Sequence, residues 1–176
     1  MGIADFDFVK YDQKLLEHLK RHLEGSGIPG SYFLKGVFPT AQSVVDYALD
    51  QIADNYHGKL LIQQVDAGCV IGYDNLVPLD ALPKEAEVLQ EPRDGRMVYV
   101  VGGIEQRPTT VVTIIAKPQE DGRHGFETIY PGTYAPLFPM TEEELQSEYS
   151  RDALSQAFAE NEVSTKFWKT HGFVQR

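Results

Sequence analysis

Two runs of strand-forming residues decide the fold of this chain: residues 110–116 read Thr-Val-Val-Thr-Ile-Ile-Ala, and residues 125–130 read Gly-Phe-Glu-Thr-Ile-Tyr. β-Branched and aromatic side chains favour strands, and the Pro131-Gly132 pair that follows is a strong turn signal. The segment between the two runs is too short for a parallel crossover, so the runs are expected to pair as an antiparallel hairpin.

A loop that closes symmetrically fixes the register of this hairpin. The facing pairs are then Thr113 with Thr128, Val111 with Tyr130, and Ile115 with Phe126. One face of the hairpin would carry a stripe of hydroxyl groups among apolar neighbours. Such a stripe can hydrogen-bond a ligand, and it can equally be ordinary pairing between threonines beside a half-buried tyrosine.

The regions on either side of the hairpin differ in their periodicity. Residues 1–58 are expected to be helical, with leucines at helical spacing on a first helix and Thr40 capping a second. Residues 59–135 hold short apolar runs separated by turns and are expected to form a meandering sheet, with residues 74–92 as an extended connector. Residues 136–176 are expected to hold a helix over about 150–160.

The sequence therefore predicts a single α+β domain over residues 1–176. In this prediction, N-terminal helices pack on an antiparallel meander sheet, and a C-terminal helix follows.

Composition restricts the class of protein further. The chain has 176 residues, 42% of them apolar and 24% charged, which is ordinary for one globular domain and argues against disorder or a coiled coil. It holds no apolar run of the roughly 18–20 residues that a membrane span needs, and its acidic start does not read as a secretory signal. Its single cysteine, Cys69, excludes an internal disulfide and is expected to be a small buried apolar residue. A cytoplasmic protein without a membrane partner is expected.

Charge is unevenly distributed along the chain. The net charge of −10 opposes the binding of polyanions at long range. Residues 141–162 hold one basic and seven acidic side chains. Residues 91–140 hold nearly equal numbers of basic and acidic side chains, and the charged side chains of residues 163–176 are all basic. If the chain binds an anionic ligand, that ligand should bind where residues 91–140 and 163–176 meet. The acidic helices could instead dock a basic protein.

Several functions are excluded because their motifs are missing. The sequence has no phosphate-binding glycine loop, dinucleotide fingerprint, Gly-x-Ser-x-Gly elbow or calcium loop. His18 and His22 have the four-residue spacing of metal ligands on a helix, but the basic residues beside them favour a solvated helix face. No metal and no cofactor are therefore expected.

Two later histidines are candidates for catalysis. His124 precedes the second strand of the hairpin, and His171 lies in a basic, aromatic tail with Lys166. Two imidazoles and a cation can cleave RNA without a metal: one imidazole takes the proton of a 2′-hydroxyl, the other protonates the leaving oxygen, and the cation stabilises the phosphorane. Each histidine can also be structural, and the catalytic reading requires both rings to share one cleft.

Residues 109–116 and 124–132 resemble the central hairpin of the phage and polymorphic-toxin ribonucleases grouped with barnase, EndoU, the colicin-type nucleases and RelE. These proteins place helices before a meandering antiparallel sheet, and the resemblance spans roughly residues 59–135. It implies that a histidine, a hydroxyl group and a cation converge on one face of the sheet. The catalytic residues so implied are His124, His171, Tyr130 and Thr128, and the substrate-binding residues are Arg107, Thr113 and Lys166.

The first functional expectation is thus a metal-independent ribonuclease-like protein of prophage or toxin association, with RNA as its partner. One alternative is a non-catalytic acidic binding module, immunity- or adaptor-like, that docks a basic protein. Another is a self-associating domain, because nine tyrosines, nine phenylalanines and one tryptophan exceed what the core needs. Whether the chain is an enzyme is left open among these three.

Overall fold

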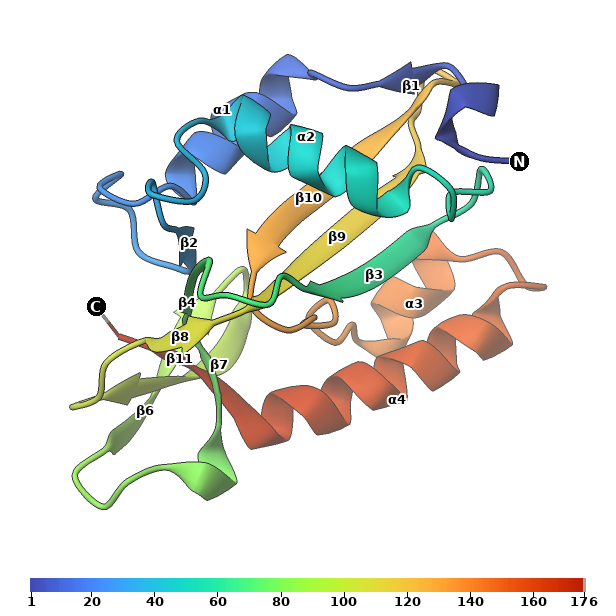
Figure 1. Ribbon diagram of the computed structural model, residues 1–176. Coiled ribbons are helices and arrows are strands. Elements are labelled where there is room, and N and C mark those ends of the chain that lie inside the picture. Colours follow the sequence, from blue (N-terminus) through green and yellow to red (C-terminus); the bar gives the residue numbers. More distant parts are fainter. Residues whose placement is uncertain (176) are drawn as a thin grey trace. The chain divides into compact units, whose positions relative to one another are not determined.

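The computed structural model describes residues 1–175, which form two compact units (Figure 1). Unit 1 comprises Met1–Asn75 and Gln106–Tyr134, and unit 2 comprises Leu76–Glu105 and residues 135–175. Both units contain helices and strands, so the expected α+β class is confirmed. The predicted order of a helical part, a sheet and a helical tail does not coincide with the units, because each unit takes strands from two separate stretches of the chain.

Unit 1 is built on a four-stranded sheet in the order β1-β10-β9-β3. The strands are Phe8–Val9 (β1), Leu61–Asp66 (β3), Val111–Pro118 (β9) and His124–Pro131 (β10). β9 pairs antiparallel with both β3 and β10, so the predicted hairpin is confirmed, while β1 runs parallel to β10.

The register of the hairpin differs from the prediction. Thr113 faces Tyr130, Ile115 faces Thr128, and Ala116 faces Phe126, because the register shifts between Phe126 and Thr128. The bulge inserts one extra residue, Glu127, into β10. A symmetric loop closure was the wrong assumption, since a bulge moves every later pair by one position.

Helices α1 (Gln13–Arg21) and α2 (Ala41–Ile52) cover one face of this sheet (Figure 1). Side-chain oxygens of Asp12 and Thr40 cap them by accepting from the backbone N–H groups of Leu15 (3.0 Å) and Ser43 (3.1 Å). The predicted leucine stripe of the first helix is buried, and it packs with α2 and the sheet into one apolar core. Central members of that core are Leu15, Leu16, Leu19, Leu23, Val44, Val45, Ile52, Val112, Ile114 and Ile129.

A second, three-stranded sheet completes unit 1 in the order β2-β4-β8. Its strands are Tyr32–Phe33 (β2), Gly72–Asp74 (β4) and Arg107–Thr109 (β8), and a short 3-10 helix, Ile3–Asp5 (η1), opens the chain. Gly72 is required here because a Cβ at this position would collide with the carbonyl oxygen of Tyr32 on the paired strand.

Cys69 is exposed, so the prediction that it is buried is wrong. β3 ends at Asp66, whose Oδ1 accepts the N–H of Gly68 (2.8 Å) in a tight turn, and Gly68 adopts a φ of 74°. Cys69 therefore lies in the connection between β3 and β4 and not on a strand.

Unit 2 contains a four-stranded sheet in the order β5-β11-β7-β6. Its strands are Leu76–Pro78 (β5), Glu87–Arg93 (β6), Arg96–Gly102 (β7) and His171–Val174 (β11), and Leu79–Ala81 (η2) is a short 3-10 helix. The expected connector over residues 74–92 thus contains two strands. Asp94 (φ 49°) and Gly95 (φ 75°) form the tight turn that pairs β6 with β7.

Two helices follow in unit 2, α3 (Glu142–Glu148) and α4 (Leu154–Thr170) (Figure 1). The expected C-terminal helix exists, but its predicted end near residue 160 is wrong. Residues 161–170 contain no glycine or proline to stop it, so α4 continues to Thr170. The tail then pairs as β11 between β5 and β7. Among residues 1–175, no helix is both long and apolar enough to cross a membrane.

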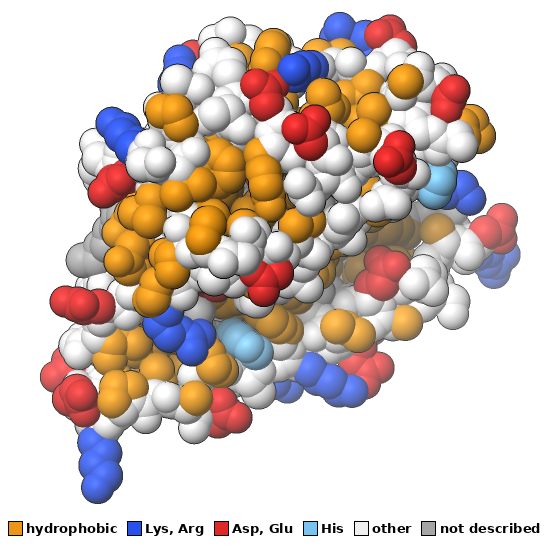
Figure 2. Space-filling model, in the orientation of Figure 1, with side chains coloured by type: hydrophobic (Ala, Val, Ile, Leu, Met, Phe, Trp, Pro, Cys, Tyr) orange, Lys and Arg blue, Asp and Glu red, His pale blue; other side chains and the backbone are white. Residues whose placement is uncertain are grey.

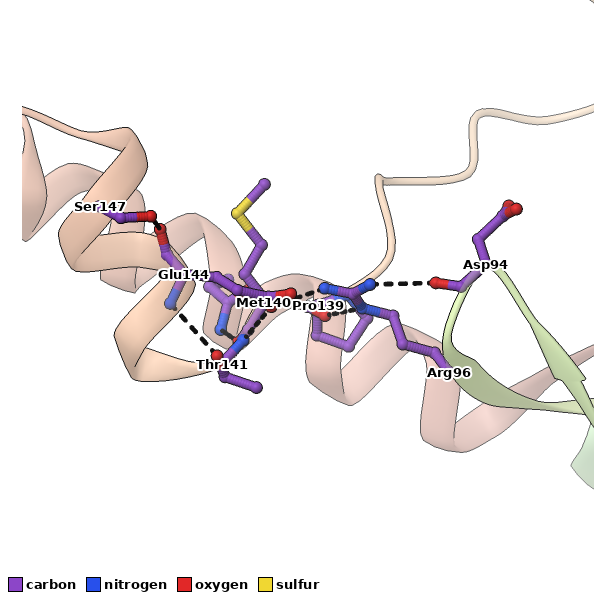
Figure 3. A network of polar contacts seen from close by, with 8 residues as sticks. Asp94, Arg96, Pro139, Met140, Thr141, Glu144 and Ser147 are labelled. Carbon is purple, nitrogen blue, oxygen red and sulfur yellow. Dashed lines mark hydrogen bonds and ion pairs between the residues drawn. The ribbon is translucent and has the colours of Figure 1, made fainter.

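Arg96 ties the β6–β7 turn to the start of α3 (Figure 3). Its Nε donates to the carbonyl oxygen of Pro139 (2.6 Å), one terminal nitrogen pairs with Glu144 (2.7 Å), and the other donates to the carbonyl oxygen of Asp94 (3.2 Å). Thr141 caps α3 by accepting from the Glu144 N–H (3.2 Å), as Figure 3 shows. The hydrogen bond from the Thr141 backbone N–H, followed by the Arg96 charge, lowers the pKa of Glu144.

Candidate functional site

One face of α1 carries a row of polar, mainly basic side chains in unit 1. Lys14, His18 and Arg21 are spaced by four and then three residues, so they lie along the same side of the helix. With Gln13 and Glu17 they line a hollow of about 370 Å³. Neither Lys14 nor Arg21 forms an ion pair with any of residues 1–175, so both charges are available to a ligand.

His18 lies beside the exposed edge of β10. Its Nε2 is 3.3 Å from the hydroxyl oxygen of Thr128, a residue 110 positions away in the chain. Burial lowers the pKa of His18, the neighbouring His22 and Arg21 lower it further, and Glu127 opposes them. The imidazole is therefore predominantly neutral near pH 7 and can accept a proton.

A second hollow, of about 640 Å³, lies at the loop end of the β9–β10 hairpin, beside the residues that connect the two strands. Lys14 lines both hollows, so they adjoin along α1. The two hollows together are called the groove along α1 and β10. The cations of the hairpin are already paired: Lys117 with Glu127 (2.7 Å) and Arg123 with Asp121 (2.5 Å). The hydrogen bond from Arg123 lowers the pKa of Asp121. Asp12 and Glu120 also line this hollow, so it is polar and slightly acidic, and the unpaired cations lie on α1.

Exposed charges of both signs are interspersed on the face of the molecule shown in Figure 2. A large positive field is not to be expected with a net charge of −10. An anionic ligand would depend on short-range contacts with individual cations such as Lys14 and Arg21.

His124, a predicted catalytic residue, is half-buried at the start of β10 and forms a hydrogen bond with a buried tyrosine. The hydroxyl of Tyr56 lies 2.6 Å from His124 Nδ1, and the ring of Phe6 packs against the imidazole with centroids 4.7 Å apart. Tyr56 is fully buried and needs a partner for its hydroxyl group. Through these contacts His124 satisfies the buried hydroxyl group of Tyr56 and packs against Phe6 in unit 1.

His171, the other predicted catalytic histidine, belongs to unit 2 and ends α4. Its Nδ1 lies 3.0 Å from the carbonyl oxygen of Phe167, and the two rings stack with centroids 4.0 Å apart. Lys166 is exposed on the same helix and pairs with Glu162 (2.9 Å). His124 and His171 thus have separate local partners in separate units.

The remaining predicted residues lie on strands of unit 1. Thr113 is fully buried and its hydroxyl donates to the carbonyl oxygen of Gly132 (2.8 Å), a placement that suits anchoring the turn after β10 and not contact with a substrate. Tyr130 is half-buried opposite Thr113, and Arg107 is exposed on β8. Thr128 is the predicted residue that the fold brings to the groove of α1.

Sequence reasoning missed the importance of α1. The spacing of Lys14, His18 and Arg21 opposite buried leucines was visible, but it is also what any solvated helix face shows. The contact of His18 with Thr128 depends on how α1 packs along β10, and no local pattern signals such a long-range pairing. The bulge at Glu127 was equally hidden, because it depends on the loop geometry.

Comparison with known proteins gives one distant structural similarity among its findings. No family profile matches the sequence, and no curated protein matches it. A crystal structure of a conserved hypothetical protein from Toxoplasma gondii ME49 is similar over 84% of this chain and 88% of that chain, at 13% identity and a TM-score of 0.43. That likeness carries no argument about function, so the chemistry has to be argued from the groove itself.

Proposed function

We propose that unit 1 is a metal-independent ribonuclease-like enzyme whose reaction takes place in the groove along α1 and β10. The observation that carries the proposal is a predominantly neutral imidazole, His18, between two unpaired cations on one helix face and beside the hydroxyl group of Thr128. This combination supplies a base and positive charge without a metal.

The chemistry follows from these groups. His18 would take the proton of a ribose 2′-hydroxyl, and that oxygen would attack the adjacent phosphorus and expel the 5′-oxygen, which takes a proton from water. Lys14 and Arg21 flank His18 and would offset the charge that develops on the phosphorane. Thr128 would orient the imidazole ring through its hydroxyl group.

The experiment is cleavage of a panel of fluorescent RNA oligonucleotides by the full chain in EDTA. A catalytic base contributes about 10²–10⁴-fold, so His18→Gln should reduce cleavage by that factor. Lys14→Ala and Arg21→Ala should each reduce it less. His57→Gln is the matched control, because His57 is an exposed histidine of unit 1 whose Nδ1 contacts only the carbonyl oxygen of Met1.

Two outcomes would overturn the proposal. Folded wild-type protein that cleaves no RNA of the panel contradicts the function. Full activity of His18→Gln together with loss of activity in His124→Ala or His171→Ala contradicts the site and returns it to the residues predicted from the sequence.

A second candidate is an acidic binding module for a basic protein, and one observation favours it. Exposed carboxylates that form no ion pair within residues 1–175 lie on α3, in the turn after it and in the first half of α4: Glu142, Glu143, Glu148, Asp152 and Glu160. Binding of a basic partner should weaken with salt and be lost when Glu142, Glu143 and Glu148 are replaced by glutamine. A partner that binds this variant as tightly as wild type would exclude the surface.

A further inference from the structure

His18 and His22 form a pair of imidazoles at the end of α1. They are four residues apart, with His22 as the residue that ends the helix, and their ring centroids lie 4.8 Å apart at an interplanar angle of 67°. Four-residue spacing on a helix places two side chains on the same face within reach of one ligand. The pair is distinct from His57, His124 and His171, which have other ring or backbone partners.

The separation of the rings matches that of two histidines sharing one ion. A divalent transition metal lies about 2.0–2.1 Å from an imidazole nitrogen, hence about 3.2 Å from the ring centre. Two rings bound at angles between square-planar and tetrahedral values then have centroids about 4.5–5.2 Å apart. The observed 4.8 Å falls inside that interval.

His22 has one ring nitrogen tied to the backbone. Its Nδ1 lies 2.8 Å from the carbonyl oxygen of Ser31, and because a carbonyl can only accept, Nδ1 carries the proton and donates it. The tautomer is thereby fixed, and Nε2 is left with its lone pair. Metal-bound histidines usually donate the proton of their other ring nitrogen to a backbone carbonyl, a carboxylate or a water molecule in this way.

His18 can supply the second nitrogen. The 3.3 Å between its Nε2 and Thr128 Oγ1 is at the long end of hydrogen bonding, so a metal bond can replace this contact. As metal ligands, both rings must be neutral imidazoles. Arg21 disfavours a cation near His18, while Glu127 favours one.

From this geometry we infer that His18 and His22 together bind one divalent ion of the copper, nickel or zinc class. No cluster of three or more His, Cys, Asp or Glu side chains suited to a metal occurs in residues 1–175. Water therefore completes the coordination sphere, and the ion is exchangeable. If the proposed function also holds, which this inference does not require, the bound ion occupies the base and inhibits cleavage.

The test is a Zn²⁺ titration of the full chain, followed by calorimetry and by the imidazole resonances in NMR at pH 7.5. We expect one bound ion, with the His18 and His22 resonances shifting together and ahead of those of His57, His124 and His171. His18→Gln should lose the calorimetric binding phase while His57→Gln retains it. This readout needs no RNA and no activity, so it fails or succeeds separately from the proposed function.

The inference is overturned if Zn²⁺ does not bind, if it shifts only one ring of the pair, or if it shifts all five histidines alike. It is also overturned if His18→Gln binds as wild type does. The His18 ring is only partly desolvated by its neighbours and the residue lies on the solvent side of α1, so its replacement should leave the fold intact. The NMR titration of the wild type decides the question even where a variant does not fold.

Discussion

Different interactions stabilise the interior of each of the two units. In unit 1, eighteen buried apolar residues of the described chain form one cluster that spans both helices and the sheet. Among the described residues of unit 2, the corresponding cluster has three buried members, Val77, Val101 and Val174, with four partly buried apolar residues packed against them. Unit 2 relies instead on directional contacts: Phe138 and Phe173 pack on Trp168 with centroids 4.7 and 5.2 Å away, and Arg96 bridges a turn and a helix.

This difference in packing indicates which unit is better suited to a rigid catalytic groove. A well-packed core fixes α1 against β10, so the backbone positions from which the groove side chains project are held in place. Unit 2 depends more on single aromatic contacts, caps and ion pairs. Substitutions in each unit test this difference through their effects on stability.

The largest effect is expected from Ile52→Ala in unit 1. Ile52 is fully buried in the main core, and truncating such a residue costs about 2–5 kcal/mol of unfolding free energy. Urea unfolding should show this loss, and hydrogen exchange should rise over α1, α2 and β9. Leu60→Ala, at an exposed position of unit 1, should change stability by less than about 0.5 kcal/mol. Equal effects of the two substitutions would contradict the packing described.

In unit 2 the strongest single effect is expected from Arg96→Met. The substitution keeps an apolar stem but removes the part-buried charged hydrogen bond to the carbonyl oxygen of Pro139, which is worth about 1–2 kcal/mol. It also removes the solvent-exposed pair with Glu144, which adds little. Trp168, the single tryptophan, reports on unit 2 by fluorescence during unfolding. An unchanged transition would show that the network of Figure 3 does not stabilise unit 2.

A smaller effect is expected from Thr141→Ala, which removes the cap of α3. Loss of such a cap costs about 1 kcal/mol, whereas Thr141→Ser keeps the oxygen that accepts from Glu144 and should unfold as wild type does. Circular dichroism during thermal unfolding measures both variants. A serine variant as unstable as the alanine variant would mean that packing of the threonine methyl group, and not the cap, is responsible.

The smallest expected effect is a dependence of the stability of unit 1 on pH. The pKa values of His18 and His22 lie below their ordinary 6.5 in the folded chain, so the unfolded chain binds more protons as pH falls below that value. Stability should therefore be full above about pH 7 and decline as pH falls through the folded pKa values. His22→Gln should flatten this decline between pH 7.5 and 5.5. The same slope in both proteins would show that these histidines titrate alike in the folded and unfolded chains.

Sequence patterns predicted the local elements of this fold well. The leucine period and Thr40 gave the two helices of unit 1, and β-branched runs gave the β9–β10 hairpin, because these signals are written in neighbouring residues. The bulge at Glu127 and the strand at His171–Val174 escaped prediction, because both depend on partners distant in the chain.

Prediction of the candidate site was limited in the same way. Thr128 was chosen for its hydroxyl group, and the fold brings it to His18. His124 and His171 were chosen for their chemistry, but their hydrogen bonds go to Tyr56 and to the end of α4. A sequence shows which groups are present, whereas packing decides which of them have partners already.

The central claim, that the groove along α1 and β10 of unit 1 binds RNA, is tested most directly by NMR with a short oligonucleotide whose 2′-hydroxyl groups are methylated and so cannot be cleaved. If RNA binds there, the amide shifts of Lys14, His18, Arg21 and Thr128 should change with a common affinity that weakens as salt rises. Shifts confined to unit 2, or none at millimolar oligonucleotide, would contradict it.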